Sequence, residues 1–125
     1  MKYSADKQEK YVILRLNEEK LDTTIAPELK SEFTTLQTEG FKHAVVNLGD
    51  VKYSDSSGLS ALLVGNRLFE GGSFVLCEVQ DHVQKLLSIS QLDKVLDIVP
   101  TEEEAVESVM MSNLEDDLRS EEASE

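Results

Sequence analysis

Residues 45–63, VVNLGDVKYSDSSGLSALL, join two apolar runs through a short polar loop. The first run has the length of a β-strand, and the second is apolar almost all round, as in a largely buried helix. A strand that leads directly into a buried helix is typical of an α/β domain. The segment SDSSGLS, residues 54–60, lies at that junction. It could cap the helix, carry a nucleophilic serine, or carry a serine that another protein modifies.

The residues before this junction predict two strands and a helix. Residues 11–16, YVILRL, predict a strand, and the first eleven residues can supply a hairpin partner for it. A helix is expected to run to about Thr38, because Pro27 suits a first turn and Gly40 suits an end. Its apolar residues recur at spacings of three and four: Ile25, Leu29, Phe33 and Leu36.

The residues after the junction continue the alternation of strands and helices. Short β-rich runs at residues 73–79 and 95–99 predict strands, and residues 81–89 predict a helix between them. Thr101 is a suitable cap for a further helix, whose first turn is rich in glutamate. We therefore expect an α/β fold with a mixed or partly parallel central sheet and helices covering at least one face.

The charge of the chain is strongly negative and unevenly distributed. The net charge is −13 over 125 residues, and the residues from Thr101 onward alone carry −9. Binding to nucleic acids or to anionic membrane surfaces requires clusters of Lys and Arg, which the sequence lacks. The composition therefore disfavours both as partners and favours a protein or a small molecule.

The sequence also predicts where the chain works. Cys77 is the single cysteine, so an internal disulfide is excluded, and its apolar surroundings predict a buried, inert thiol. The first residues, MKYSADKQEK, contain no apolar signal-peptide region, and no stretch approaches the length of a membrane span. We expect a cytoplasmic protein that does not insert into a membrane.

Catalysis finds little support in the sequence. A nucleophilic serine needs a base, and the only histidines are His43, at the start of a predicted strand, and His82, at the start of a predicted helix. The serines around Ser56 do not form the G-x-S-x-G turn of α/β-hydrolases, and no phosphate-binding loop or metal-binding spacing is present. We predict no enzymatic activity, no metal and no cofactor.

The junction itself offers a more specific alternative to a plain helix cap. The start of a helix carries free N–H groups and a partial positive charge, which suit a phosphate. Ser56, or as a second choice Ser57, is therefore a physically reasonable phosphorylation site. The simpler interpretation is a Ser or Asp cap worth about 1 kcal/mol, and local sequence alone favours it.

The same residues resemble the signature of STAS domains, in particular of bacterial anti-sigma factor antagonists. The resemblance rests on the apolar strand, the D-S-S-G-L motif at residues 55–59 and the apolar helix after it, and LDTTIAPELK at residues 21–30 is a second match. It covers about residues 8–110. It implies one STAS domain over residues 1–112, with a mixed sheet and helices mainly on one side. We expect residues 113–125, NLEDDLRSEEASE, to be an acidic, disordered tail.

The resemblance further implies a phosphorylation switch. In such antagonists the first serine of the motif, here Ser56, is phosphorylated by an anti-sigma factor with serine kinase activity. The unphosphorylated form binds that factor and frees the sigma factor, phosphorylation ends binding, and a serine phosphatase resets the protein. The residues expected to contact the partner are Asp22, Thr23, Thr24, Ile25, Ser54, Asp55, Ser57, Gly58 and Leu59.

Two alternatives remain open at this stage. The chain could be a STAS subunit of another assembly, such as a stressosome or a lipid-transport system, although retention of D-S-S-G favours the regulatory antagonists. A small serine hydrolase with Ser56 as nucleophile is the weaker alternative, because no base is apparent.

Overall fold

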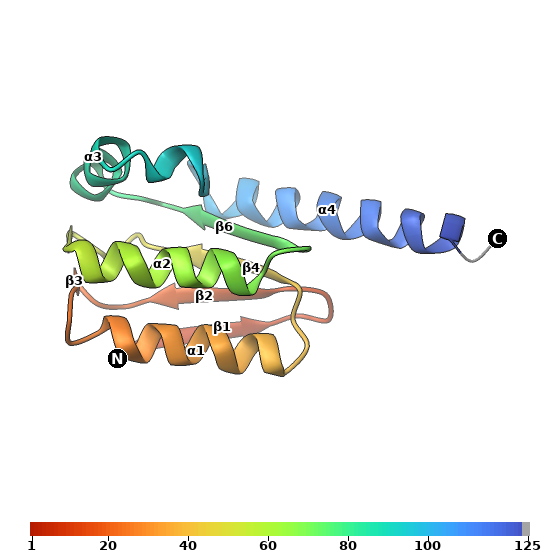
Figure 1. Ribbon diagram of the computed structural model, residues 1–125, viewed down its shortest axis with the longest axis horizontal. Helices are drawn as coiled ribbons and strands as arrows, with labels where there is room; N and C mark the ends of the chain where they lie inside the picture. The colour runs from red at the N-terminus through yellow and green to blue at the C-terminus, as the bar shows by residue number, and fades with distance from the viewer. Residues whose placement is uncertain (124–125) are drawn as a thin grey trace.

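The computed structural model describes residues 1–123, with side chains through residue 119, and is built around a mixed β-sheet (Figure 1). The sheet has the strand order β1-β2-β4-β6-β7. β1 is antiparallel to β2, whereas β2, β4, β6 and β7 are parallel to their neighbours. The bounds of the strands are Tyr3–Lys7, Val12–Leu16, His43–Asn47, Ser73–Cys77 and Asp97–Val99. The predicted hairpin and the predicted mixed sheet are both confirmed.

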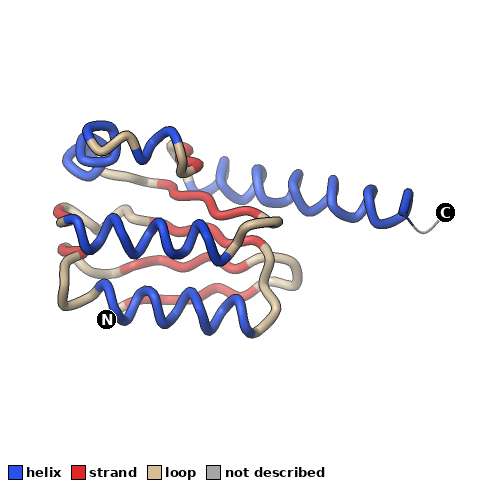
Figure 2. Tube along the Cα trace, in the orientation of Figure 1, coloured by secondary structure: helices blue, strands red, loops and turns tan. Residues whose placement is uncertain are grey.

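Helices cover the two faces of the sheet unequally, as Figure 2 shows. α1 (Ala26–Thr38), α2 (Ser56–Leu68) and α3 (Asp81–Ile89) contribute to one large apolar core, and α4 (Glu102–Ala123) packs on the opposite face. Alternate residues of β2 divide between these layers: Leu14 lies in the large core, and Ile13 lies in the smaller one under α4. This arrangement confirms an α/β domain with helices mainly on one side.

The pair α1 and α2 packs closely because a glycine faces two aromatic rings. A Cβ atom at Gly65 would lie 2.5 Å from Phe74 and 2.8 Å from Phe33. The rings of Phe33 and Phe74 meet edge to face, with centroids 5.2 Å apart. This packing fixes α2, and with it the D-S-S-G motif at its start.

A second, two-stranded sheet was not predicted from the sequence. β3 (Lys20–Leu21) pairs in parallel with β5 (Tyr53–Ser54). Both strands have two residues, which is too short for an alternating pattern to show. The pairing joins the segment before α1 to the loop before α2.

The C-terminal region differs from the prediction. Residues 113–123 continue α4 instead of forming a disordered tail, so that prediction is wrong for them, while residues 124–125 lie outside the described part of the chain. The physical reason is that residues 102–123 contain no Pro or Gly, and the inner face of the helix continues to contact the sheet as far as Asp116. None of the described helices is both long and apolar enough to cross a membrane.

Candidate functional site

The D-S-S-G loop lies at the edge of the sheet where the parallel strands end. The chain leaves β4, passes through β5 and enters α2 at Ser56. The Asp55 amide donates to the Leu21 carbonyl oxygen at 3.2 Å, so the loop is tied to the segment that precedes α1. Ligands of open α/β sheets bind at such carboxyl ends of strands.

Asp55 is the N-cap of α2, which decides between the Ser and the Asp that the sequence left open. Its Oδ1 accepts hydrogen bonds from the backbone amides of Ser57, at 3.0 Å, and Gly58, at 3.1 Å. The Ser57 hydroxyl donates to the same oxygen at 2.5 Å. The Ser57 hydroxyl, and then the amide of Gly58, lower the pKa of the Asp55 carboxyl group. Asp55 is therefore a carboxylate at neutral pH. It accepts hydrogen bonds from two backbone amides that the start of the helix leaves without an intrahelical partner.

The two serines after Asp55 have different surroundings. Ser57 is half-buried and its hydroxyl is engaged by Asp55. Ser56 is the first residue of α2 and is exposed, and no partner for its hydroxyl is found among the described side chains. Of the two candidates, Ser56 has the accessible hydroxyl.

Three of the predicted contact residues are buried beneath the loop. Ser54 is 2% exposed, and its hydroxyl donates to the Asp55 carbonyl oxygen at 3.1 Å. A Cβ atom at Gly58 would lie 2.4 Å from both the Leu21 carbonyl oxygen and the Ser54 hydroxyl, so only glycine fits there. Leu59 is 9% exposed and belongs to the large core. These residues support the loop from below.

The other predicted contact residues lie beside the loop. Asp22 makes a turn in which its Oδ1 accepts from the Thr24 amide at 3.0 Å, and the Thr23 amide helps to lower the pKa of Asp55. Thr23 and Thr24 are exposed, and Ile25, half-buried, packs against the core. A groove of about 550 Å³ runs past Asp22, Thr24 and Ile25 to the β3 segment. The structure therefore brings the 22–25 segment and the 55–57 segment together, across more than thirty positions of sequence.

An aromatic pair next to the loop was missed in the sequence. Tyr53 is 45% exposed, and its ring stacks on that of His82 at the start of α3, with centroids 6.0 Å apart and an angle of 18°. Gln80 holds the same region by donating from Nε2 to the Gly49 carbonyl oxygen at 2.5 Å. These contacts join residues about thirty positions apart in the sequence, so no local sequence pattern predicts them.

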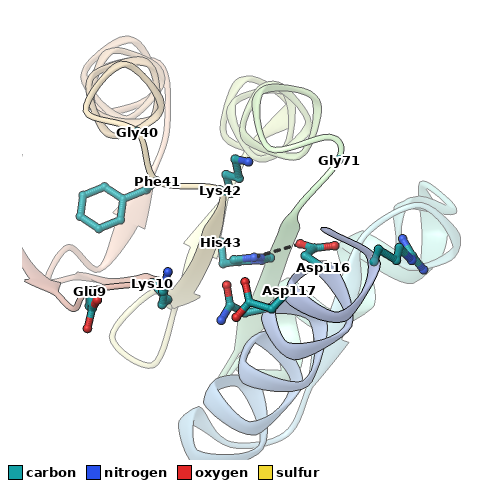
Figure 3. Close-up of a pocket in the computed structure, with 11 residues that line it drawn as sticks. Glu9, Lys10, Gly40, Phe41, Lys42, His43, Gly71, Asp116 and Asp117 are labelled. Atoms are coloured by element: carbon teal, nitrogen blue, oxygen red, sulfur yellow. Dashed lines mark ion pairs between the residues drawn. The ribbon is translucent and has the colours of Figure 1, made fainter. Parts of the chain in front are cut away.

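The second histidine lies in a different place. His43 is 2% exposed, and its Nδ1 contacts the Ser73 hydroxyl at 3.1 Å. Its Nε2 contacts Asp116 at 3.4 Å, as Figure 3 shows. Burial, opposed by Asp116, lowers the pKa of His43. Neither His43 nor His82 bonds to Ser56 in the described structure, and no three described His, Cys, Asp or Glu residues are grouped to hold a metal ion.

Cys77 follows the sequence prediction. It is fully buried, and burial is the main cause that raises the pKa of its thiol to about 12. A thiol with this pKa is protonated at neutral pH and unreactive.

Comparison with known sequences relates this site to one protein family. A family model described as "STAS domain" matches residues 2–105. The "Anti-sigma F factor antagonist" of Paenibacillus polymyxa is 33% identical over 73 residues, which are 57% of this chain and 62% of that protein. The chain thus spans somewhat less than two thirds of this relative.

Solved structures share the fold over most of the chain. A Thermotoga maritima protein, provisionally described as an anti-sigma factor antagonist, is 28% identical with a TM-score of 0.80, over 86% of this chain and 94% of that one. The Bacillus cell fate determinant SpoIIAA in its phosphorylated form is 23% identical with a TM-score of 0.67, over 86% of this chain and 99% of that one. At that identity the second likeness shows the fold alone.

Proposed function

Since the chain belongs to the STAS domain family, we propose that it is an anti-sigma factor antagonist. Phosphorylation of Ser56 switches its binding to the anti-sigma factor off. The observation that carries the proposal is the contrast at the start of α2: Ser56 offers a free, exposed hydroxyl, while Asp55 holds that of Ser57. The unphosphorylated protein binds an anti-sigma factor with serine kinase activity and thereby frees the sigma factor.

Phosphorylation changes the charge of this surface with little effect on the fold. The kinase transfers the γ-phosphoryl group of ATP to Ser56 Oγ, with loss of the hydroxyl proton and release of ADP. The new group adds a charge of about −1.5 to −2 at neutral pH. Asp55 already accepts the amides of Ser57 and Gly58, so the phosphate gains little from the helix terminus and is repelled by the adjacent carboxylate. It therefore remains on the surface, where it blocks and repels the partner.

The exposed residues beside Ser56 provide the partner contacts. Thr23 and Thr24 can form hydrogen bonds, and Ile25 contributes apolar surface at the groove. Ser54, Gly58 and Leu59 act from below, by holding Asp55 and the start of α2 in place. This division revises the expectation that all of these residues touch the partner.

The proposed role needs two protein partners and no catalytic group on this chain. A serine phosphatase hydrolyses the Ser56 phosphate and restores binding. The net charge of −13 argues against direct contact with nucleic acid, and the role belongs in the cytoplasm, where sigma factors act.

The test is phosphorylation by the cognate anti-sigma kinase with ATP, followed by peptide mass spectrometry and a binding assay. We expect phosphate on Ser56, its loss in Ser56→Ala, and at least tenfold weaker binding of the anti-sigma factor to the phosphorylated form. Ser60→Ala, an exposed serine one turn further along α2, is the matched control and should be modified normally. Phosphate on Ser57 or elsewhere in wild-type protein, or unchanged binding after modification, would contradict the proposal.

A further inference from the structure

The face of α4 that points away from the sheet carries an apolar stripe, and the described chain leaves this stripe uncovered. One adjacent pair is followed by residues at spacings of three and four positions, so the members of the stripe share one face of the helix. Met110, Met111, Leu114 and Leu118, called here the outer stripe, are 56%, 59%, 51% and 52% exposed. Over eight residues an α-helix rises about 12 Å, the length over which helix-recognition surfaces place their apolar anchors.

The stripe faces outward because the opposite side of α4 is committed to the sheet. Ala105 and Val109 are completely buried in the smaller core. Glu102 forms an ion pair with Arg15 at 2.8 Å at the start of the helix. About four turns later Asp116 contacts His43, a pair that Figure 3 draws. Since both ends of this inner face are anchored, α4 presents the outer stripe on a fixed element.

This part of α4 lies outside the region that defines the family. The family model ends at residue 105, and the Thermotoga structure covers 86% of this chain, although 94% of its own length is matched. In Figure 1, α4 extends past the sheet, away from the end where α2 begins. The outer stripe therefore lies beyond the residues that the family model matches, and it is separate from the Ser56 surface.

The charges around the stripe indicate what kind of partner fits it. α4 also exposes three acidic residues that lie close to the stripe in sequence: Glu107, Glu115 and Asp117. Arg119 is the one basic residue from Thr101 onward. Pairing with α4 of a second copy would bring these carboxylates close to those of the other copy, and the like charges would repel each other. An anionic lipid surface would be repelled for the same reason.

We propose that the outer stripe of α4 is a docking surface for a basic amphipathic helix of a partner protein. The partner's apolar residues pack on the stripe, and its Lys or Arg residues pair with the flanking carboxylates. The four apolar side chains supply affinity through burial, and the acidic flanks supply orientation and the rate of encounter. The surface can be occupied whether or not Ser56 is phosphorylated.

The probe is a labelled 14-residue peptide of Leu and Lys, with Leu at helical spacings of three and four, titrated against the full chain by fluorescence anisotropy. We expect Leu114→Gln/Leu118→Gln, which retains good helix formers, to weaken binding at least tenfold. Neutralising the flanks with Glu107→Gln/Glu115→Gln/Asp117→Asn should also weaken it and reduce its salt dependence. Ile89→Gln, at an 80% exposed residue of α3, is the control and should bind as wild type.

Several outcomes would overturn the proposal. Equal affinity for wild type and the Leu114→Gln/Leu118→Gln variant would show that the stripe is not used. Equal binding of a peptide with Glu in place of Lys would show that the acidic flanks do not select a basic partner, which also contradicts the proposal. Sedimentation that shows a wild-type dimer converted to monomer by the same variant would assign the stripe to a second copy. Wild-type binding to phosphatidylcholine vesicles, lost in the variant, would assign it to a membrane.

Discussion

The two faces of the sheet are held by different kinds of interaction. The face under α1 and α2 is a continuous apolar core in which the ring of Phe74 meets Phe33 edge to face and stacks on Phe69. The face under α4 has a small apolar cluster, and two polar pairs anchor the helix, Arg15 with Glu102 at its start and His43 with Asp116 about four turns later. We therefore expect the first face to give the domain most of its stability, with little dependence on pH. The stability that the second face contributes should depend on the charges of these two pairs, and therefore on pH.

Removal of an aromatic ring from the large core should have the greatest effect. Phe33 is completely buried and contacts Phe74. Phe33→Ala should lower the free energy of unfolding by about 3–5 kcal/mol, because the cavity adds to the lost burial. Val109→Ala, in the cluster under α4, should cost about 2 kcal/mol. Urea denaturation followed by circular dichroism measures both, and equal losses would show that the faces contribute alike.

Loss of the ion pair at the start of α4 should have an intermediate effect. Arg15 donates to Glu102 at 2.8 and 3.0 Å, and Asn47 donates to the same carboxylate at 3.1 Å. The Arg15 hydrogen bonds are the main cause that lowers the pKa of Glu102. The resulting stability is present above the usual glutamate pKa and is lost as pH falls through the lower folded-state value.

Glu102→Gln should therefore destabilise the protein by about 1–2 kcal/mol at pH 7 and remove part of its acid sensitivity. Glu103→Gln, an exposed neighbour in the same helical turn, is the matched control. Urea titrations at pH 7 and at pH 3.5 test the prediction. A difference between Glu102→Gln and wild type that is the same at both pH values would contradict it.

The smallest effect is expected at His43, and it should appear as a pH slope. Burial is the main cause that lowers the pKa of this histidine below its usual value of 6.5, against the opposing effect of Asp116. The unfolded chain therefore binds the proton more tightly, so His43 makes stability fall as pH drops below about 6.5. His43→Gln should flatten the stability profile between about pH 5 and 7, measured by thermal unfolding. An unchanged slope would show that folding does not shift the pKa of His43, and a steeper slope would show that the effect of Asp116 exceeds that of burial.

Local sequence patterns predicted much of the fold. The strands were recognised from apolar runs, the helix that contains Pro27 from its three-and-four spacing, and a Ser or Asp cap before α2 from residue type. The two-residue strands β3 and β5 carry no such pattern, and Tyr53 and His82 meet only because α3 returns to the loop. The continuation of α4 was missed because acidic composition was given more weight than the absence of helix-breaking residues.

The sequence by itself determined the order of strands and helices and the position of the D-S-S-G motif at a helix start, because periodicity, capping and turn chemistry act over a few residues. Only the tertiary structure decided that Ser56 is exposed while Asp55 holds Ser57, that Gly58 and Leu59 support the loop from below, and that the 22–25 segment lies beside it. It also decided which side of α4 faces the sheet and which carries the outer stripe. Exposure and contact depend on which distant segments the fold brings together, and local chemistry does not encode that.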